Sequence, residues 1–169
     1  MLNLALAAAT TIDPELHQTF KPGKENTEKY QRAIEPLAKI QATNSKIRFI
    51  YTFIQEDSKI HFVLDTPPPG DHDNDGIDDK SYIGDEYPEA TDIMFEVLDT
   101  GEPRITGIVS DRWGTFVSAY APLRNKQDSV IGTVGLDIEA EDYLKEMEII
   151  SNVYEQNLLT AGMISVLVG

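Results

Sequence analysis

The sequence contains no cysteine. This absence excludes disulfide bonds, thiolate metal sites and a cysteine nucleophile, and it leaves the redox compartment open. Histidine is also scarce: His17, His61 and His72 are scattered along the chain. No nucleophile elbow, His-Glu-x-x-His pair or phosphate-binding glycine loop is present. We therefore expect no enzymatic activity, and the catalytic alternative is a hydrolase that uses paired carboxylates such as Asp71 and Asp73.

Basic residues are few in comparison with acidic ones. Fourteen lysine and arginine residues stand against 29 aspartate and glutamate residues, which gives a net charge of -15. A surface of this sign repels a phosphate backbone. Nucleic acid is therefore not an expected partner.

Long apolar runs are absent as well. Residues 2–9 are apolar but short and have no basic residue before them, so they match neither a signal peptide nor a membrane span. Residues 158–169 contain no charged side chain, although a full span needs roughly 20 apolar residues. We interpret this second run as the start of a membrane span, and packing of both ends on the domain as amphipathic helices is the alternative.

The remaining pattern predicts an α+β fold with a five-stranded antiparallel sheet. A chain of 169 residues suits one domain. Apolar spacing predicts helices at the N-terminus and at the C-terminal end, and Pro36 is expected to kink or split the helix in which it lies. The helices are expected at residues 3–11, 15–20, 25–42, 91–98 and 139–159. Runs of β-branched and aromatic residues predict strands at 47–54, 60–65, 104–109, 113–123 and 130–138.

Residues 112–146 carry the most specific pattern. Trp113-Gly114-Thr115 begins a strand, residues 118–122 continue it as Ser-Ala-Tyr-Ala-Pro, and residues 132–138 read Gly-x-x-Gly-Leu-Asp-Ile before an acidic helix. In order and spacing these elements resemble the C-terminal half of Cache domains, which are PAS-like sensor modules of prokaryotic membrane receptors. The resemblance implies a helical region at 1–44, a PAS-like Cache core at 45–138 and a C-terminal helix at 139–169 that leads toward a membrane span. No internal repeat is present, which favours a single Cache module.

The resemblance also implies a function. We expect an extracytoplasmic domain, on the periplasmic or extracellular side of a cell membrane, that binds a small-molecule ligand for signal transduction. Its partners are then its own transmembrane helices, a cytoplasmic output domain and a second copy in a homodimer. On the final helix Tyr143, Met147, Ile150 and Tyr154 recur at helical spacing, which suits a lever that relays the signal. The alternative is a secreted calcium-dependent binding module without a signalling role.

An acidic loop follows the second predicted strand. Lys80 is the only basic residue between positions 71 and 99. Alternating carboxylates followed by glycine match the opening of a calcium loop, in which oxygen atoms converge on a hard cation. The expected calcium ligands are Asp71, Asp73, Asp75, the Ile77 carbonyl group and Asp79, with Asp78 as an alternative to Asp79. An EF-hand would require glutamate where Tyr82 stands, and a solvated acidic turn without an ion is the competing interpretation.

The candidate ligand-binding residues belong to the region of resemblance and its surroundings. Amino-acid-binding Cache domains hold an ammonium group with an aspartate placed like Asp137, and this residue would otherwise cap the final helix. Their Arg-x-Trp-Tyr segment corresponds to residues 84–87, where only the tyrosine, Tyr87, is kept. Strand alternation places Phe116, Ser118 and Tyr120 on one face and Trp113, Thr115 and Val117 on the other. The predicted pocket residues are Tyr87, Arg112, Trp113, Tyr120 and Asp137.

Overall fold

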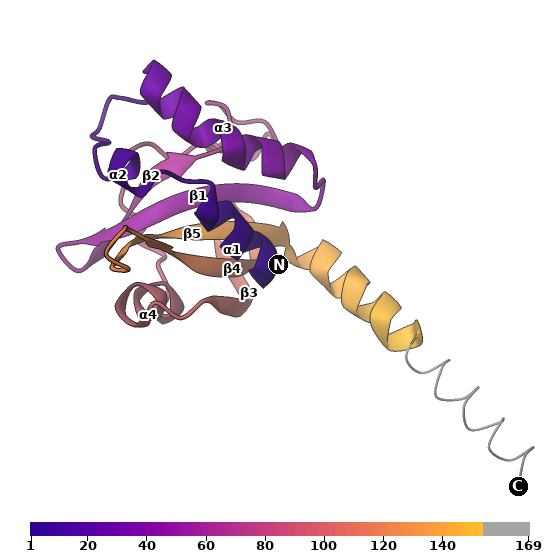
Figure 1. The fold of residues 1–169 in the computed structure, drawn as a ribbon. Helices are drawn as coiled ribbons and strands as arrows, with labels where there is room; N and C mark the ends of the chain where they lie inside the picture. Colours follow the sequence, from indigo (N-terminus) through magenta and orange to yellow (C-terminus); the bar gives the residue numbers. More distant parts are fainter. Residues whose placement is uncertain (154–169) are drawn as a thin grey trace, which may run out of the picture. The chain divides into compact units, whose positions relative to one another are not determined.

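The computed structural model describes residues 1–153, and its first compact unit is Met1–Glu139. Three helices come before the first strand, and one helix follows the acidic loop (Figure 1). The helices are α1 (Leu2–Thr10), α2 (Pro14–His17), α3 (Glu28–Ala42) and α4 (Asp92–Thr100). The strands are β1 (Ile47–Glu56), β2 (Lys59–Asp65), β3 (Arg104–Asp111), β4 (Gly114–Arg124) and β5 (Val130–Glu139). The predicted α+β class and five strands are confirmed.

The five strands form one antiparallel sheet in the order β2-β1-β5-β4-β3. β1 lies between β2 and β5, although β5 begins more than 70 residues after β1 ends. In this register Tyr51 pairs with Asp65 on one side, and Phe49 pairs with Asp137 on the other. The sheet thus brings two aspartates from distant parts of the sequence to either side of one strand.

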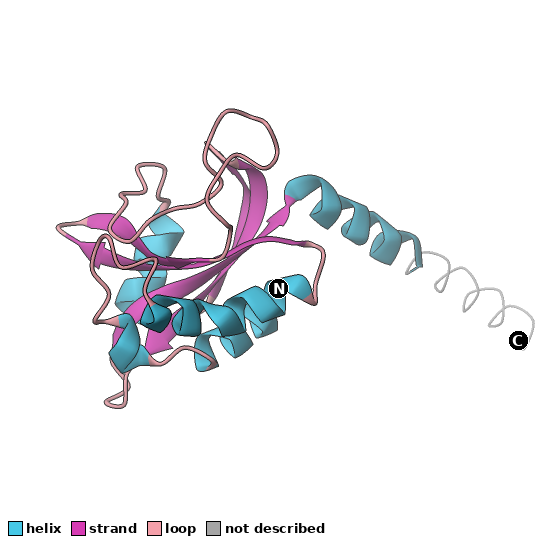
Figure 2. Ribbon diagram, turned by 90° about the horizontal axis from the view of Figure 1, so that it is seen from above, coloured by secondary structure: helices cyan, strands magenta, loops and turns pink. Residues whose placement is uncertain are grey.

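The two faces of the sheet are covered differently. Residues of β1 alternate in direction, so that Ile50 and Thr52 face the N-terminal helices while Phe49 and Tyr51 face the other way. His17 of α2 confirms the first face, because its Nε2 lies 2.8 Å from the Thr52 hydroxyl oxygen. Figure 2 shows these helices on one side of the sheet and long loops on the other. The loop side carries the aromatic core and the packed residues of α4.

Two of the helices, α2 and α3, begin at side chains that cap them. The Asp13 carboxylate accepts hydrogen bonds from the first backbone N–H groups of α2, and the Thr27 hydroxyl accepts one from Tyr30 in α3. Pro36 does not split α3, contrary to one of the predicted outcomes. Ile34 and Leu37, which lie before and after the proline in the same helix, are buried, and their packing on the sheet holds the helix across it.

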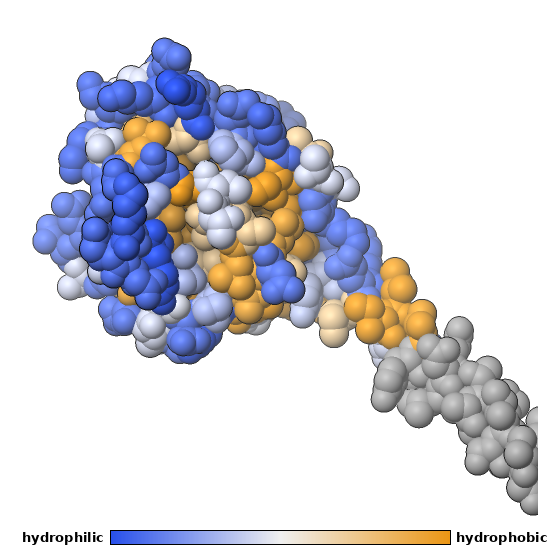
Figure 3. All heavy atoms as spheres, in the orientation of Figure 1, coloured by the Kyte–Doolittle hydropathy of each residue, from blue (hydrophilic) through white to orange (hydrophobic). Residues whose placement is uncertain are grey.

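The second unit begins at Ala140. Residues 140–153 are helical, as predicted for the first part of the final helix, and the remainder of that prediction, with Tyr154 and residues 158–169, lies outside the described residues. Large apolar side chains are exposed along this helix: Leu144, Met147, Ile149, Ile150 and Val153. Hydrophobic atoms also show at the end of this stretch in Figure 3. Within residues 1–153 no helix is long and apolar enough to cross a membrane.

Candidate ligand-binding site

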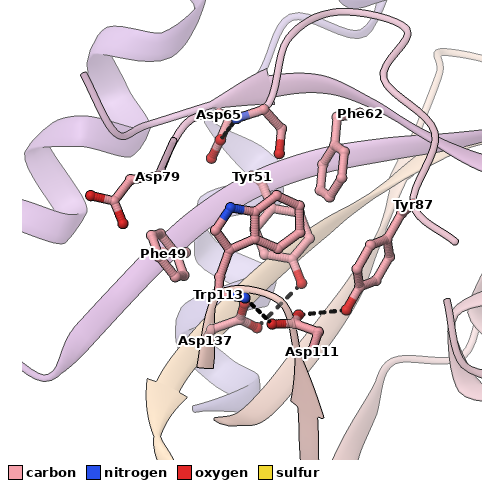
Figure 4. A pocket seen from close by; sticks show the side chains of 10 residues that line it. Phe49, Tyr51, Phe62, Asp65, Asp79, Tyr87, Asp111, Trp113 and Asp137 are labelled. Atoms are coloured by element: carbon pink, nitrogen blue, oxygen red, sulfur yellow. Dashed lines mark hydrogen bonds between the residues drawn. The ribbon is translucent and has the colours of Figure 1, made fainter. Parts of the chain in front are cut away.

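A cavity lies on the loop side of the sheet, above β1 and β2. It is narrow, with a volume of about 20 Å³, roughly the room for one water molecule. Its wall is made of aromatic and acidic side chains with one serine (Figure 4). The lining residues are Phe49, Tyr51, Phe62, Asp65, Asp79, Ser81, Tyr87, Asp111, Trp113 and Asp137.

The aromatic rings of the cavity contact one another. The Phe62 ring lies 5.5 Å from that of Tyr51, 5.4 Å from that of Tyr87 and 5.8 Å from that of Trp113, measured between centroids. Tyr87 and Trp113 are 5.9 Å apart. These rings present π-electron faces, which attract cations.

Asp137 lies at one end of the cavity and is almost fully buried. Its Oδ1 accepts a hydrogen bond of 3.2 Å from the Tyr51 hydroxyl group. Burial raises the pKa of Asp137 from 3.8 to about 7; a hydrogen bond from Ser118 opposes the rise, and the charge of Asp111 adds to it. The side chain points into the cavity.

Asp65 lies on the opposite side of the Trp113 ring from Asp111 and Asp137 (Figure 4). Its Oδ2 accepts a short hydrogen bond of 2.6 Å from the Ser81 backbone N–H group. Burial raises the pKa of Asp65 to about 8, although this hydrogen bond and the nearby charge of Lys80 act in the opposite direction. Two nearly buried carboxyl groups therefore hold their protons up to near-neutral pH.

Trp113 covers the cavity from a turn and not from a strand. The β3–β4 turn closes where Asp111 pairs with Gly114, and the Asp111 carboxylate accepts hydrogen bonds from the Trp113 backbone N–H group (2.8 Å) and the Tyr87 hydroxyl group (2.6 Å). Strand alternation therefore does not apply to Trp113, and its predicted placement on the face opposite Tyr120 is wrong. The indole N–H group donates to the Asp78 carbonyl oxygen (2.9 Å), which joins the cavity roof to the acidic loop.

The two remaining predicted pocket residues lie beside the cavity. Tyr120 belongs to the aromatic cluster beneath it, where its ring contacts Phe53 at 5.5 Å. The Arg112 guanidinium group lies over the Trp113 ring at 5.1 Å and forms an ion pair of 2.6 Å with Glu89. No lysine, arginine or histidine is among the lining residues found in the described part of the chain.

The acidic loop gathers three of the predicted calcium ligands. Carboxylate oxygen atoms of Asp71, Asp73 and Asp75 lie within 4.8 Å of one another, and all three residues are exposed. Asp71 accepts hydrogen bonds from the backbone N–H groups of Asp75 (3.1 Å) and Gly76 (2.9 Å), and Gly76 has the positive φ of 95° that the turn requires. Exposed acidic groups of this kind also occur in solvated turns.

The other two predicted ligands, Asp79 and Ile77, have different contacts. Asp79 instead lines the cavity, where its Oδ1 lies 3.0 Å from the Arg48 guanidinium group. The same guanidinium group lies 2.7 Å from Asp73. Ile77 contributes its backbone N–H group to the Asp75 carboxylate (2.8 Å). Asp71, Asp73 and Asp75 are thus the predicted ligands whose carboxylate oxygen atoms lie together.

No protein-family model and no curated protein matches the chain. Solved structures do match. The ligand-binding domain of the Campylobacter jejuni chemoreceptor Tlp3, in complex with L-valine, superposes with a TM-score of 0.52 at 14% identity, over 83% of this chain and 52% of that one. The periplasmic sensory domain of the chemoreceptor Tlp1 of the same organism gives a TM-score of 0.52 at 13% identity, over 84% and 54%. The chain spans about half the length of both. It therefore has the fold of the Cache-type, PAS-like sensory domains, as residues 112–146 predicted.

Proposed function

We propose that the chain is the extracytoplasmic ligand-sensing domain of a transmembrane receptor, without enzymatic activity. The observation that supports this function most is the cavity of aromatic rings and carboxylates on the loop side of a PAS-like sheet. Ligand cavities combine apolar walls with a few convergent polar groups, and buried groups with perturbed pKa values mark functional sites. Tyr87, Trp113 and Asp137 are the proposed contact residues, with Arg112 and Tyr120 supporting them from outside.

The cavity favours a cationic or neutral ligand over a simple carboxylate. Arg48 is engaged with Asp73 and Asp79, and Arg112 is engaged with Glu89, so both arginines closest to the cavity already have acidic partners. An entering anion would be placed among carboxylates with no facing cation, which is costly in a desolvated site. The Tlp3 domain is described in complex with L-valine, an α-amino acid that also carries a carboxylate. We expect this chain to prefer an amine that lacks one.

Signal relay is proposed from the continuity of the chain. β5 carries Asp137, pairs with β1 through Phe49, and ends at Glu139, after which the helix of residues 140–153 begins. A ligand that shifts β5 therefore acts on an element directly joined to the helix. We propose that this helix leads to the receptor's transmembrane helices, a cytoplasmic output domain and a homodimeric partner.

A calcium-dependent binding module, secreted and without a signalling role, is the second candidate. It is favoured by the convergence of Asp71, Asp73 and Asp75. Oxygen ligands in an exposed loop suit calcium in preference to a transition metal. Such an ion would also relieve the repulsion among the three carboxylates.

A ligand screen tests the proposed function. Thermal unfolding is measured with primary amines, α-amino acids and carboxylates of matched carbon skeleton, each in the presence of calcium and of a chelator. The proposed sensor is stabilised by amines in both conditions. Stabilisation by calcium alone, with no response to any small organic molecule, would favour the second candidate.

A further inference from the structure

We propose that the turn between β3 and β4 is a lid over the cavity, closed in this structure, and that a ligand enters only after the lid opens. The lid consists of Arg112 and Trp113, the two residues between the paired Asp111 and Gly114. This inference rests on the proposed function, since it concerns access to the same cavity. Apparent affinity falls with the fraction of molecules that are competent to bind, so the stability of the closed lid sets the sensitivity of the sensor.

The closed cavity is too small for an organic ligand. Its volume of about 20 Å³ holds roughly one water molecule. Pockets that bind small molecules typically enclose roughly 300–1,000 Å³. The rings of Phe62, Tyr87 and Trp113 also lie within 5.9 Å of one another, measured between centroids. Part of the wall must therefore move before a molecule as small as 1-aminobutane can enter.

The wall formed by the sheet is fixed in place. Tyr51 and Phe62 belong to paired strands and are almost fully buried. The Tyr51 ring lies so close to the backbone of Gly135 that a methyl group added there would overlap it. Tyr87 is also buried, and its backbone N–H group donates to the Ile60 carbonyl oxygen at 2.9 Å. Movement of any of these rings would disturb the core of the domain.

Trp113 is the part of the wall with the fewest constraints. It is only partly buried, and it lies in a turn at the end of β3, which is an edge strand of the sheet. Figure 4 shows its indole ring lying across the cavity. Gly114 follows with a φ of 144°, a conformation that gives the turn freedom to adjust. Rotation of the Trp113 side chain, with small backbone changes at Gly114, would move the ring while the strands stay paired.

Two polar contacts hold the lid closed, and both join it to the loop between β2 and α4. The indole N–H group of Trp113 donates to the Asp78 carbonyl oxygen at 2.9 Å. The Arg112 guanidinium group lies over the indole ring at 5.1 Å and donates two hydrogen bonds, of 3.0 Å and 2.6 Å, to the Glu89 carboxylate. Both contacts are exposed to solvent, where hydrogen bonds and ion pairs stabilise a structure only modestly. The lid is therefore closed by contacts that can be broken without unfolding the domain.

The fluorescence of Trp113 tests the lid directly, because this residue is the only tryptophan in the sequence. Glu89→Gln weakens the ion pair with Arg112 and changes no residue of the cavity wall. Glu86→Gln is the matched control: it alters a carboxylate of the same loop that pairs instead with Lys59, at 2.7 Å. In the ligand-free domain, acrylamide should quench Trp113 more strongly in Glu89→Gln than in wild type or in the control.

Rapid mixing with 1-aminobutane measures the opening step. The rate of the fluorescence change should level off at high amine concentration, at the rate of lid opening. Glu89→Gln should raise this plateau, and lower the apparent dissociation constant, by about two- to fivefold, which is the contribution of an exposed ion pair. Glu86→Gln should match wild type in both quantities.

The outcomes separate the lid from the proposed function. Amine binding seen by calorimetry without any change in Trp113 fluorescence overturns the lid and leaves an amine sensor in place. A rate that rises linearly with amine concentration and reaches no plateau overturns opening before entry. If no amine binds, the proposed function fails, and acrylamide quenching, which requires no ligand, still decides on the lid: equal quenching of wild type and both variants overturns it.

Discussion

Asp137→Asn is expected to make the ligand-free domain more stable at pH 8 while removing its affinity for amines. The substitution keeps the size of the side chain and an oxygen that accepts the hydrogen bond from Tyr51, but it removes the ionisable group. Most substitutions at buried polar positions destabilise proteins. A stabilising effect would therefore be specific to a carboxyl group that is costly to ionise where it lies.

The magnitude follows from the raised pKa of Asp137. In the unfolded chain the carboxyl group ionises near pH 3.8, whereas in the folded domain it keeps its proton up to about pH 7. Between these values the folded state binds more protons than the unfolded state, so stability falls as pH rises and is constant above about pH 7. Three pKa units at about 1.4 kcal/mol each correspond to about 4 kcal/mol of lost stability, and the asparagine variant does not lose it.

Urea unfolding of both proteins at pH 4.5 and pH 8 measures this difference. The stability of the variant relative to wild type should increase by a few kcal/mol between the two pH values. Groups that do not interact with Asp137 contribute equally to both proteins and cancel: burial lowers the pKa of His17 to about 4, which separately costs stability as pH falls from 6.5 toward 4. Asp65 adds to the difference in the same direction, because the charge of Asp137 contributes to its raised pKa and the variant lacks that charge. Asp99→Asn is the control for the loss of one surface charge and should follow wild type. If the free energies of unfolding of wild type and Asp137→Asn change in parallel with pH, ionisation of Asp137 does not destabilise the folded domain.

Three further predictions concern the loop, the sheet and the helix. If the acidic loop binds calcium, a calcium concentration one hundred times the dissociation constant stabilises the fold by about 2.7 kcal/mol. The melting temperature of wild type should then differ between calcium and chelator, whereas that of Asp73→Ala or Asp75→Ala should not. Identical melting of wild type in both conditions contradicts the site. Gly135→Ala should lower the free energy of unfolding in urea by about 1–3 kcal/mol and weaken amine binding, because the added methyl group would overlap the Tyr51 ring. Unchanged stability and binding would show that this ring is free to move. In the proposed full-length receptor, insertion of one residue next to Asn152 would rotate the helix beyond it by roughly 100°. Output should then change while ligand affinity does not, and unchanged signalling argues against a rigid lever.

The strands were predictable because their residues are locally distinctive. Aromatic and β-branched runs mark β1 and β4, and a polar turn separates β4 from β5, so local periodicity suffices to find them. Asp137 was predictable from the resemblance of its strand to Cache domains. The split at Pro36 was wrong because buried neighbours on the same helix outweigh the loss of one backbone hydrogen bond.

The rest of the cavity depends on contacts that no local pattern encodes. Asp65 and Phe62 belong to it because β2 pairs with the far side of β1, and that pairing depends on the register of the whole sheet. Asp111 ends a strand like many surface aspartates, and only the turn to Gly114 directs it and Trp113 over the cavity. The sequence contains one indication of the cavity wall, the alternating aromatic residues at positions 49, 51 and 53. This alternation indicates an aromatic face of the sheet but not what covers it.

In the proposed sensor, Asp137 receives the cationic group of a small ligand. Calorimetric titration of the wild-type domain with 1-aminobutane and with butanoate, in the presence of a chelator and repeated on Asp137→Asn, tests it most directly. We expect the amine to bind to wild type, the variant to lose this binding, and butanoate to bind to neither. Butanoate binding that survives both the chelator and the substitution would contradict it.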